Sequence, residues 1–114
     1  MHKKWMTSLA VAALLALSAA GSADDSEDYE NALALAEQGD AFGQYYLGLM
    51  YAKGEGVIQD NVYAHMWFNI AASSGDSKGA SGNRDITAEI MTTAQIAEAQ
   101  QLARECVRKE YKGC

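Results

Sequence analysis

The feature that most constrains this chain is a five-residue segment that recurs in weakened form 36 positions later. Residues 36–40 are Ala-Glu-Gln-Gly-Asp, and residues 72–76 are Ala-Ser-Ser-Gly-Asp. A fixed period of this size is typical of helical repeats, whose units bury their apolar faces against neighbouring units. Between the two copies lie two helical runs that contain several aromatic residues, 41–51 and 63–72, separated by a glycine-rich turn. The sequence therefore predicts a helix-turn-helix unit.

The N-terminal segment has the pattern of an export signal. Lys3 and Lys4 precede an apolar run over residues 5–17, and small residues follow it. This pattern predicts a secretory signal peptide over residues 1–23, cleaved after Ala20 or Ala23. The run is shorter than the roughly 20 residues of a spanning helix, so an uncleaved anchor is the less favoured alternative and no stable membrane insertion is expected after cleavage. We therefore expect a single mature domain, residues 24–114, in the periplasm or secreted.

The charge of the predicted mature chain argues against nucleic acid as a partner. Loss of Lys3 and Lys4 leaves seven basic side chains against fifteen acidic ones, a formal charge of −8 instead of −6. A nucleic-acid site needs a basic stripe that releases counterions from phosphates. The basic cluster of the C-terminal region is interleaved with Glu105 and Glu110, and it is more simply a solvated helix end; its members are Arg104, Arg108, Lys109 and Lys112.

The chain has two cysteines, Cys106 and Cys114, and export would place them where disulfides persist. We expect them to pair with each other, and closure of so short a loop contributes about 2.5 kcal/mol in the chain-entropy model. That contribution matters because a domain of this size is only marginally stable. Cysteine and histidine are too few for a zinc site, since His65 is the one histidine left after processing. We predict neither a metal ion nor a cofactor.

Helical patterns flank and contain the repeated segment. Residues 26–39 predict a short helix, which Gly39 ends. Asp40 can cap the next helix, in which Gly48 costs roughly 1 kcal/mol relative to alanine and so predicts the close crossing of another backbone. We expect Trp67 of the following helix to lie beside the gap at Gly48. The residues predicted to face each other in this helix pair are Ala41, Gln44, Leu47, Gly48 and Tyr51 on the first helix, and Ala64, Trp67, Phe68 and Ala71 on the second.

A glycine turn connects the two helices of this pair. Gly54 and Gly56 suit backbone angles that other residues resist, and Val57 can fill the space beneath the turn. Asp60 or Asn61 starts the second helix.

The segment after the central unit has a weaker helical pattern. Glycine and serine dominate residues 75–84, so we expect a turn followed by a shortened helix over residues 85–91. Thr92 and Gln95 then form a capping box at the start of a clearer helix. The apolar face of that helix comprises Ile96, Ala99, Leu102, Ala103, Cys106 and Val107.

The central unit resembles the Sel1-like repeat, a relative of the tetratricopeptide repeat. The residues that carry the resemblance are Ala41, Gln44, Leu47-Gly48, Tyr51, Gly54, Gly56-Val57, Asp60, Ala64, Trp67-Phe68, Ala71-Ala72 and Gly75. The resemblance covers a full repeat over residues 40–75, with a partial repeat before it (26–39) and a degenerate one after it (76–114). It implies an all-α fold, a short right-handed α-solenoid of antiparallel helix pairs with about five helices, which binds proteins or peptides.

Two departures and one further likeness qualify this resemblance. Gly43 replaces the usual alanine, and residues 77–91 lack the leucine-glycine, tyrosine and glycine-turn signature. Cys106 and Cys114 resemble the disulfide of the cysteine-rich secreted members of the family. Some of those members are associated with cell-wall or beta-lactam binding, which leaves a related binding or hydrolase activity as an alternative.

The sequence does not favour an enzyme. Ser77 lies in a glycine-x-serine-x-glycine pattern, but a nucleophile elbow needs a strand before the serine and a histidine after it, whereas here a helix precedes and His65 lies upstream. The serine-x-x-lysine motif of penicillin-recognising enzymes is absent from the chain. His65 has no carboxylate at helical spacing, only Asn61 and Asn69, so we interpret it as a structural or surface residue.

The first helix of the unit has more apolar surface than contact with its partner helix requires. A second apolar stripe follows the first helix of the unit and consists of Phe42, Tyr45, Tyr46 and Leu49. Either the helices at residues 29–38 and 96–107 cover this stripe, or part of it stays open as a tyrosine-lined peptide groove. We predict a non-catalytic protein- or peptide-binding module of the bacterial cell envelope, with an unidentified partner. Weak self-association that covers the open solenoid ends is a further expectation.

Overall fold

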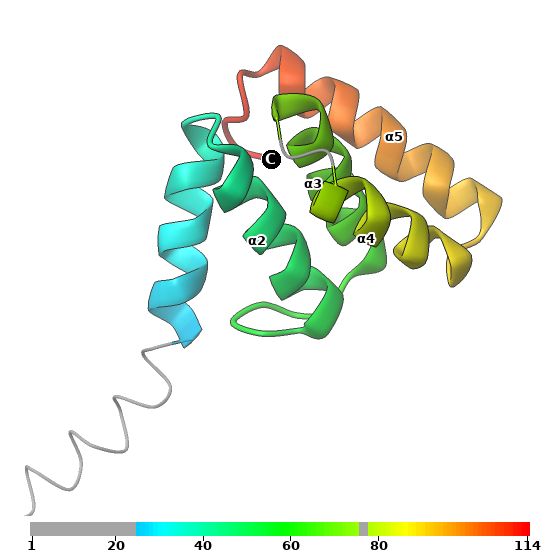
Figure 1. Ribbon diagram of the computed structural model, residues 1–114, viewed down its shortest axis with the longest axis horizontal. Coiled ribbons are helices and arrows are strands. Elements are labelled where there is room, and N and C mark those ends of the chain that lie inside the picture. The colour runs from blue at the N-terminus through cyan, green and yellow to red at the C-terminus, as the bar shows by residue number, and fades with distance from the viewer. Residues whose placement is uncertain (1–24, 76–77) are drawn as a thin grey trace, which may run out of the picture.

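The computed structural model describes residues 25–75 and 78–114, and in these residues the fold contains helices and no strand. An N-terminal helix over residues 25–37 is followed by four further helices: α2 (Ala41–Lys53), α3 (Asn61–Ser74), α4 (Lys78–Glu89) and α5 (Thr93–Arg108). Helix α3 packs against α2, α4 and α5 (Figure 1). The predicted all-α solenoid of helix pairs is thus confirmed, whereas the predicted signal peptide and Ser77 lie outside the described residues. No helix of the described part is both long and apolar enough to span a bilayer.

The predicted caps set the helix boundaries. The carboxylate of Asp40 accepts a hydrogen bond of 2.8 Å from the Gly43 amide, and that of Asp60 accepts two, from the amides of Val62 and Tyr63. At the start of α5, Thr92 and Gln95 form the reciprocal capping box. Each of these contacts satisfies amide groups that the first turn of a helix leaves without a partner.

The glycine turn between α2 and α3 brings three tyrosines together at one end of the helix pair. Gly54 and Gly56 both adopt positive φ angles, of 74° and 73°, as the sequence predicts. Tyr51 stacks on Tyr63 with ring centroids 5.4 Å apart, and it meets Tyr29 of the N-terminal helix edge to face at 6.3 Å. Burial, followed by the hydrogen bond with Tyr29, raises the pKa of Tyr51 far above its usual value. Tyr51 thus packs within a cluster of three tyrosines, and its predicted structural role stays a prediction.

The core lies where α3 meets the other helices. Its largest side chains, each less than 2% exposed, are Trp67, Phe68, Leu47, Met66, Ile70, Gln44 and Cys106. Ala64 is also completely buried, so small residues alternate with large ones along α3. Small side chains allow neighbouring helices to approach closely, and large ones then fill the remaining space.

The contact predicted at Gly48 involves a different partner from the one expected. A Cβ atom added at Gly48 would lie 2.6 Å from two carbons of the Phe68 ring, so Phe68 occupies this gap and the prediction of Trp67 there is wrong. Trp67, the next residue along α3, projects instead into the core cluster with Ala32 and Ala36 of the N-terminal helix. Adjacent residues of a helix point about 100° apart, so the two rings face different neighbours.

A close backbone crossing does occur, but at Gly43 and not at Gly48. A Cβ atom at Gly43 would lie 2.5 Å from the Leu35 Cβ atom and 3.0 Å from the Ala36 backbone nitrogen. The N-terminal helix therefore crosses α2 at the position where this chain has glycine in place of the usual alanine of the repeat.

Helix α4 begins earlier than predicted and is longer. It covers Lys78–Glu89, whereas the sequence predicted a turn over residues 75–84 and a helix only over 85–91. Tertiary contacts outweigh the poor helix propensity of glycine and serine: Ala80 is completely buried, and the Asn83 amide donates hydrogen bonds to the Tyr45 hydroxyl (3.1 Å) and the Gly79 carbonyl (2.9 Å). Gly79 itself lies against the Tyr45 ring, where a Cβ atom would be 3.3 Å from the nearest carbon.

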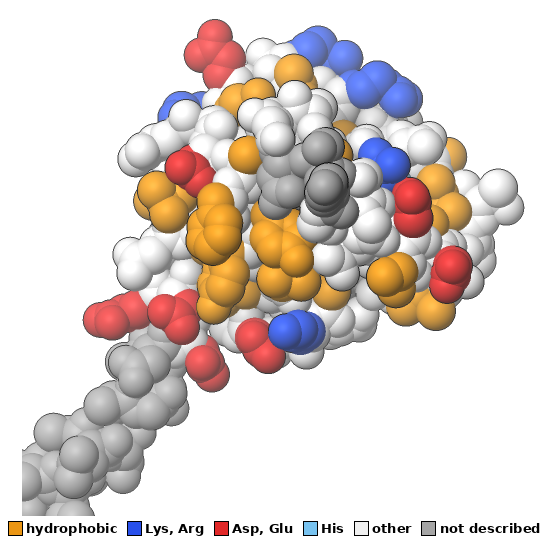
Figure 2. Space-filling model, in the orientation of Figure 1, with side chains coloured by type: hydrophobic (Ala, Val, Ile, Leu, Met, Phe, Trp, Pro, Cys, Tyr) orange, Lys and Arg blue, Asp and Glu red, His pale blue; other side chains and the backbone are white. Residues whose placement is uncertain are grey.

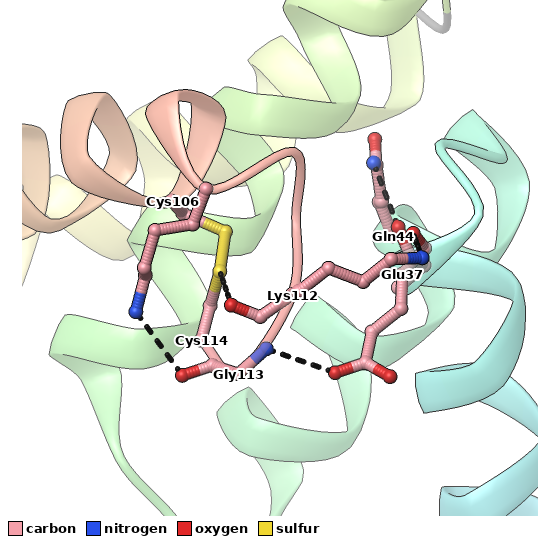
Figure 3. Close-up of a disulfide and its surroundings, with 8 residues drawn as sticks. Glu37, Gln44, Cys106, Lys112, Gly113 and Cys114 are labelled. Carbon is pink, nitrogen blue, oxygen red and sulfur yellow. Dashed lines mark hydrogen bonds between the residues drawn. A yellow bond between two sulfur atoms is a disulfide. The ribbon is translucent and has the colours of Figure 1, made fainter.

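The C-terminal tail returns from α5 to the N-terminal helix (Figure 3). The predicted disulfide joins Cys106 to Cys114, with a sulfur–sulfur distance of 2.01 Å. The loop that it closes places the Lys112 ammonium 2.7 Å from the Glu37 carbonyl and the Gly113 amide 3.0 Å from a Glu37 carboxylate oxygen. Tyr111 lies against Gly39. We call this arrangement of residues 109–114 on residues 37–39 the clasp, because it joins the last described helix to the first.

Candidate functional site

Two aromatic side chains of α2 remain open to solvent. Phe42 is 68% exposed and Tyr46 is 40% exposed, and their rings stack with centroids 6.5 Å apart and planes 19° apart. Leu35, from the N-terminal helix, is 43% exposed beside them. Hydrophobic side chains gather over α2 next to the N-terminal helix in the space-filling view (Figure 2). We call Leu35, Phe42 and Tyr46 the aromatic surface.

A hollow of about 180 Å³ lies within this surface. It is lined by Asp28, Asn31, Ala32, Leu35, Phe42, Gly43 and Tyr46. The floor of the hollow is the helix crossing at Gly43. Because Gly43 has no side chain, the backbones of α2 and the N-terminal helix approach closely there, and larger side chains flank the crossing. The hollow is therefore a direct product of the glycine that departs from the repeat pattern.

The other two candidate binding residues are less accessible. The Tyr45 ring packs against Phe68 with centroids 5.9 Å apart, and its hydroxyl accepts the hydrogen bond from Asn83. Leu49 is half-buried. The sequence offered the helices at 29–38 and 96–107 as the cover for this stripe, but it is α4 that covers Tyr45. The structure thus brings Phe42 and Tyr46 together on the surface and separates Tyr45 from them, and the binding role of all four residues stays a prediction.

His65 is a buried imidazole and not an accessible base. Its side chain is 3% exposed, and Nδ1 has no hydrogen-bond partner among the described residues. Burial lowers the pKa of His65, and the nearby positive charge of Arg84 lowers it further, while Asp85 acts in the opposite direction. Asn61 and Asn69, its expected neighbours, instead accept hydrogen bonds from Gln59 and Arg84. The group is therefore a neutral core histidine at pH 7.

No arrangement of the described residues suggests a metal centre, since no three His, Cys, Asp or Glu side chains come together there. Ser77, the serine of the glycine-x-serine-x-glycine pattern, is not among the residues that the structure describes. The aromatic surface itself offers apolar contact through Leu35, Phe42 and Tyr46.

Sequence reasoning missed two contributors to this region. Leu35 was expected only as part of the apolar face of a short helix, yet it forms one side of the aromatic surface. Asn83 lies in a stretch predicted as a turn, yet it fixes Tyr45. The signal for Leu35 was the glycine at position 43, which marks where the preceding helix crosses. Nothing in the local sequence signals Asn83.

Comparison with known families agrees with this geometry. Residues 41–76 match the family model described as the Sel1 repeat, and the match spans α2, the glycine turn and α3. No curated protein and no solved structure matches the chain. Sel1 repeats are generally non-catalytic modules that mediate protein–protein interactions. The chain therefore contains a Sel1 repeat, with α2 and α3 as its helix pair.

Proposed function

We propose that this protein is a non-catalytic protein- or peptide-binding module of the bacterial cell envelope, located in the periplasm or secreted, and that it binds its partner through the aromatic surface. The observation that carries this proposal is the exposure of the stacked Phe42 and Tyr46 rings on the first helix of the Sel1 repeat. Large aromatic side chains at a surface are characteristic anchors of protein interfaces.

The energetics favour burial of this surface by a partner. Complete burial of a side chain such as phenylalanine is worth about 1.5–3 kcal/mol, and Phe42 retains most of that potential in the free protein. The hollow beside it accepts one apolar side chain of the partner. Asp28 lines the same hollow, so a positively charged residue next to that apolar side chain is favoured.

The location rests on two observations. The N-terminal sequence has the pattern of a cleaved signal, and the two cysteines form a disulfide that an oxidising compartment preserves. Cell fractionation and N-terminal sequencing of the mature protein test this part of the proposal. A full-length N-terminus in a cytoplasmic fraction would contradict it.

Affinity capture tests the binding role. The tagged mature protein is incubated with envelope extract, and the proteins that co-elute are compared for the wild type, a Phe42→Ser/Tyr46→Ser variant and an Ile58→Ser control. Ile58 is 88% exposed in the glycine turn, outside the aromatic surface, so its replacement removes exposed apolar area elsewhere. We expect a defined partner with the wild type and the control, and its loss with the double variant.

Two results would contradict the proposal. Capture of many unfolded proteins by all three forms would indicate a folding-assisting role instead. Turnover of a chromogenic beta-lactam by the purified protein, lost on Ser77→Ala, would support the hydrolase alternative.

A further inference from the structure

A second hollow lies away from the aromatic surface, between the C-terminal halves of α3 and α5. Its volume is about 450 Å³. The apolar residues that line it are Ile70, Ala103 and Val107, and the polar ones are Asn69, Ser73, Arg104 and Arg108. Val107 is 47% exposed, whereas Ile70 and Ala103 are only 1% and 5% exposed, so Val107 supplies most of the apolar area that a ligand can reach. We call this hollow the arginine groove.

The charge of the arginine groove is opposite to that of the protein. None of its lining residues is acidic, although the chain has fifteen acidic side chains. Three other hollows each include a carboxylate: Glu27 and Glu30 in one, Asp28 in the next and Glu105 in the third. Figure 2 shows several lysine and arginine side chains near the top of the molecule, where α5 ends, and acidic side chains near the N-terminal helix and on the side of α4. The groove is thus a local positive site on an acidic molecule.

The stability of the helix does not explain Arg104. Arg104 and Arg108 are four residues apart on α5, so their charges face each other across one turn, and like charges at this spacing destabilise a helix by a few tenths of a kcal/mol. Neither guanidinium has an ion-pair partner among the described residues. The helix dipole favours Arg108 in the last turn, but its effect fades within that turn and does not account for Arg104.

The polar side chains contributed by α3 extend the recognition surface. The Asn69 carbonyl accepts a hydrogen bond of 3.1 Å from Arg84, which leaves the Asn69 amide nitrogen as a donor. The Ser73 hydroxyl donates to the Ile70 carbonyl at 2.8 Å, which leaves its oxygen as an acceptor. The groove therefore offers two guanidinium groups, an amide donor and a hydroxyl acceptor around an apolar floor.

From this arrangement we infer that the arginine groove binds the free C-terminal carboxylate of a peptide whose last residue is apolar. Arg104 and Arg108 hold the carboxylate, since guanidinium groups bind carboxylates through paired, charge-assisted hydrogen bonds. The apolar side chain lies on Ile70, Ala103 and Val107. Asn69 and Ser73 bond the peptide backbone, which a fatty acid lacks, so a peptide uses the whole groove. This site is separate from the aromatic surface and does not depend on the proposed function of that surface.

Fluorescence anisotropy tests the inference with a defined probe. The probe is a fluorescein-labelled hexapeptide, glycine-serine-glycine-serine-valine-leucine, with a free C-terminal carboxylate, and the matched probe has a C-terminal amide. Both are titrated with the disulfide-bonded mature protein at low and at physiological salt. Arg104→Gln tests the groove, and Lys53→Gln is the control, since Lys53 carries the same charge in the last turn of α2 and does not line the groove. Circular dichroism checks that each variant is folded.

We expect the carboxylate probe to bind at least tenfold more tightly than the amide probe, because charged hydrogen bonds are the strongest in such a site. Arg104→Gln weakens binding of the carboxylate probe about tenfold and removes the preference over the amide, whereas Lys53→Gln leaves both unchanged. Equal binding of the two probes, an unchanged affinity in Arg104→Gln, or no binding of either probe at millimolar protein would overturn the inference. Displacement of the probe by dodecanoate but not by unlabelled peptide would also overturn it and assign the groove to a fatty acid.

Discussion

Two glycines in helix interiors give a direct test of the packing between α2 and α3. Gly48 lies in α2, where an added Cβ atom would be 2.6 Å from the buried Phe68 ring. Gly82 lies in α4, where an added Cβ atom would meet no atom within 4 Å. The same substitution to alanine therefore has opposite expected effects at the two positions.

The magnitudes follow from two competing contributions. Alanine gains about 0.8–1 kcal/mol over glycine in a helix interior, and this gain applies at both sites. At Gly48 the methyl group must displace a ring that is completely buried, and overpacking of a core typically costs about 1–3 kcal/mol. Gly82→Ala is thus expected to raise the free energy of unfolding by about 0.5–1 kcal/mol. Gly48→Ala is expected to lower it, by up to about 2 kcal/mol, since the gain in propensity offsets part of the cost of overpacking.

Urea denaturation followed by circular dichroism measures both effects. In a domain of this size, 1 kcal/mol corresponds to a change in melting temperature of about 4–8 °C, so thermal melts resolve the difference as well. A Phe68→Leu replacement relieves the crowding, and in that background Gly48→Ala should lose most of its destabilising effect. The reasoning is refuted if Gly48→Ala stabilises the wild-type protein as much as Gly82→Ala does, because Phe68 would then not occupy the gap.

Two further predictions concern the clasp and the buried histidine. The disulfide closes a loop of sequence separation 8, so the Cys106→Ser/Cys114→Ser variant should lose about 2.5 kcal/mol of unfolding free energy in urea melts, and a loss below about 1 kcal/mol would contradict this account. The pKa of His65 is lowered in the folded state, so the unfolded state binds the proton first and stability falls as the pH drops below about 6.5. The urea midpoint should therefore decrease between pH 7.5 and pH 5.5, and less so in His65→Gln; an equal decrease in both proteins would assign the effect to other groups.

The helix pair of the repeat was predictable because its determinants are local in the sequence. Asp40, Asp60 and Thr92 cap helices through hydrogen bonds to amides two or three residues away, and such contacts depend only on short-range order. The glycines at 54 and 56 likewise act on their own backbone angles. Local rules therefore located the turn between α2 and α3 and the start of α5.

The sequence predictions were wrong where contacts between residues far apart in the sequence determine the structure. The composition of residues 75–84 predicts a turn, but contacts of Asn83 with Tyr45 and of Arg84 with Asn69, 38 and 15 residues away, accompany a helix there. Whether Trp67 or Phe68 lies at Gly48 depends on the rotation of α3 about its axis. The alternation of small and large side chains along α3 does not define that rotation. For the candidate site, the stripe of four residues was visible in the sequence. The sequence did not show which of these residues α4 covers, because it predicted α4 to be shorter than it is.

The clasp affects where unfolding of this small array of helices can begin. In an open array each unit touches only its neighbours, so unravelling can begin at either end and proceed inward. Here hydrogen bonds from Lys112 and Gly113 to Glu37, across 75 and 76 positions of sequence, join the C-terminal tail to the last residue of the N-terminal helix. We therefore expect the two terminal helices to limit each other's fraying, and a reductant that opens the Cys106–Cys114 bond to make unfolding less cooperative.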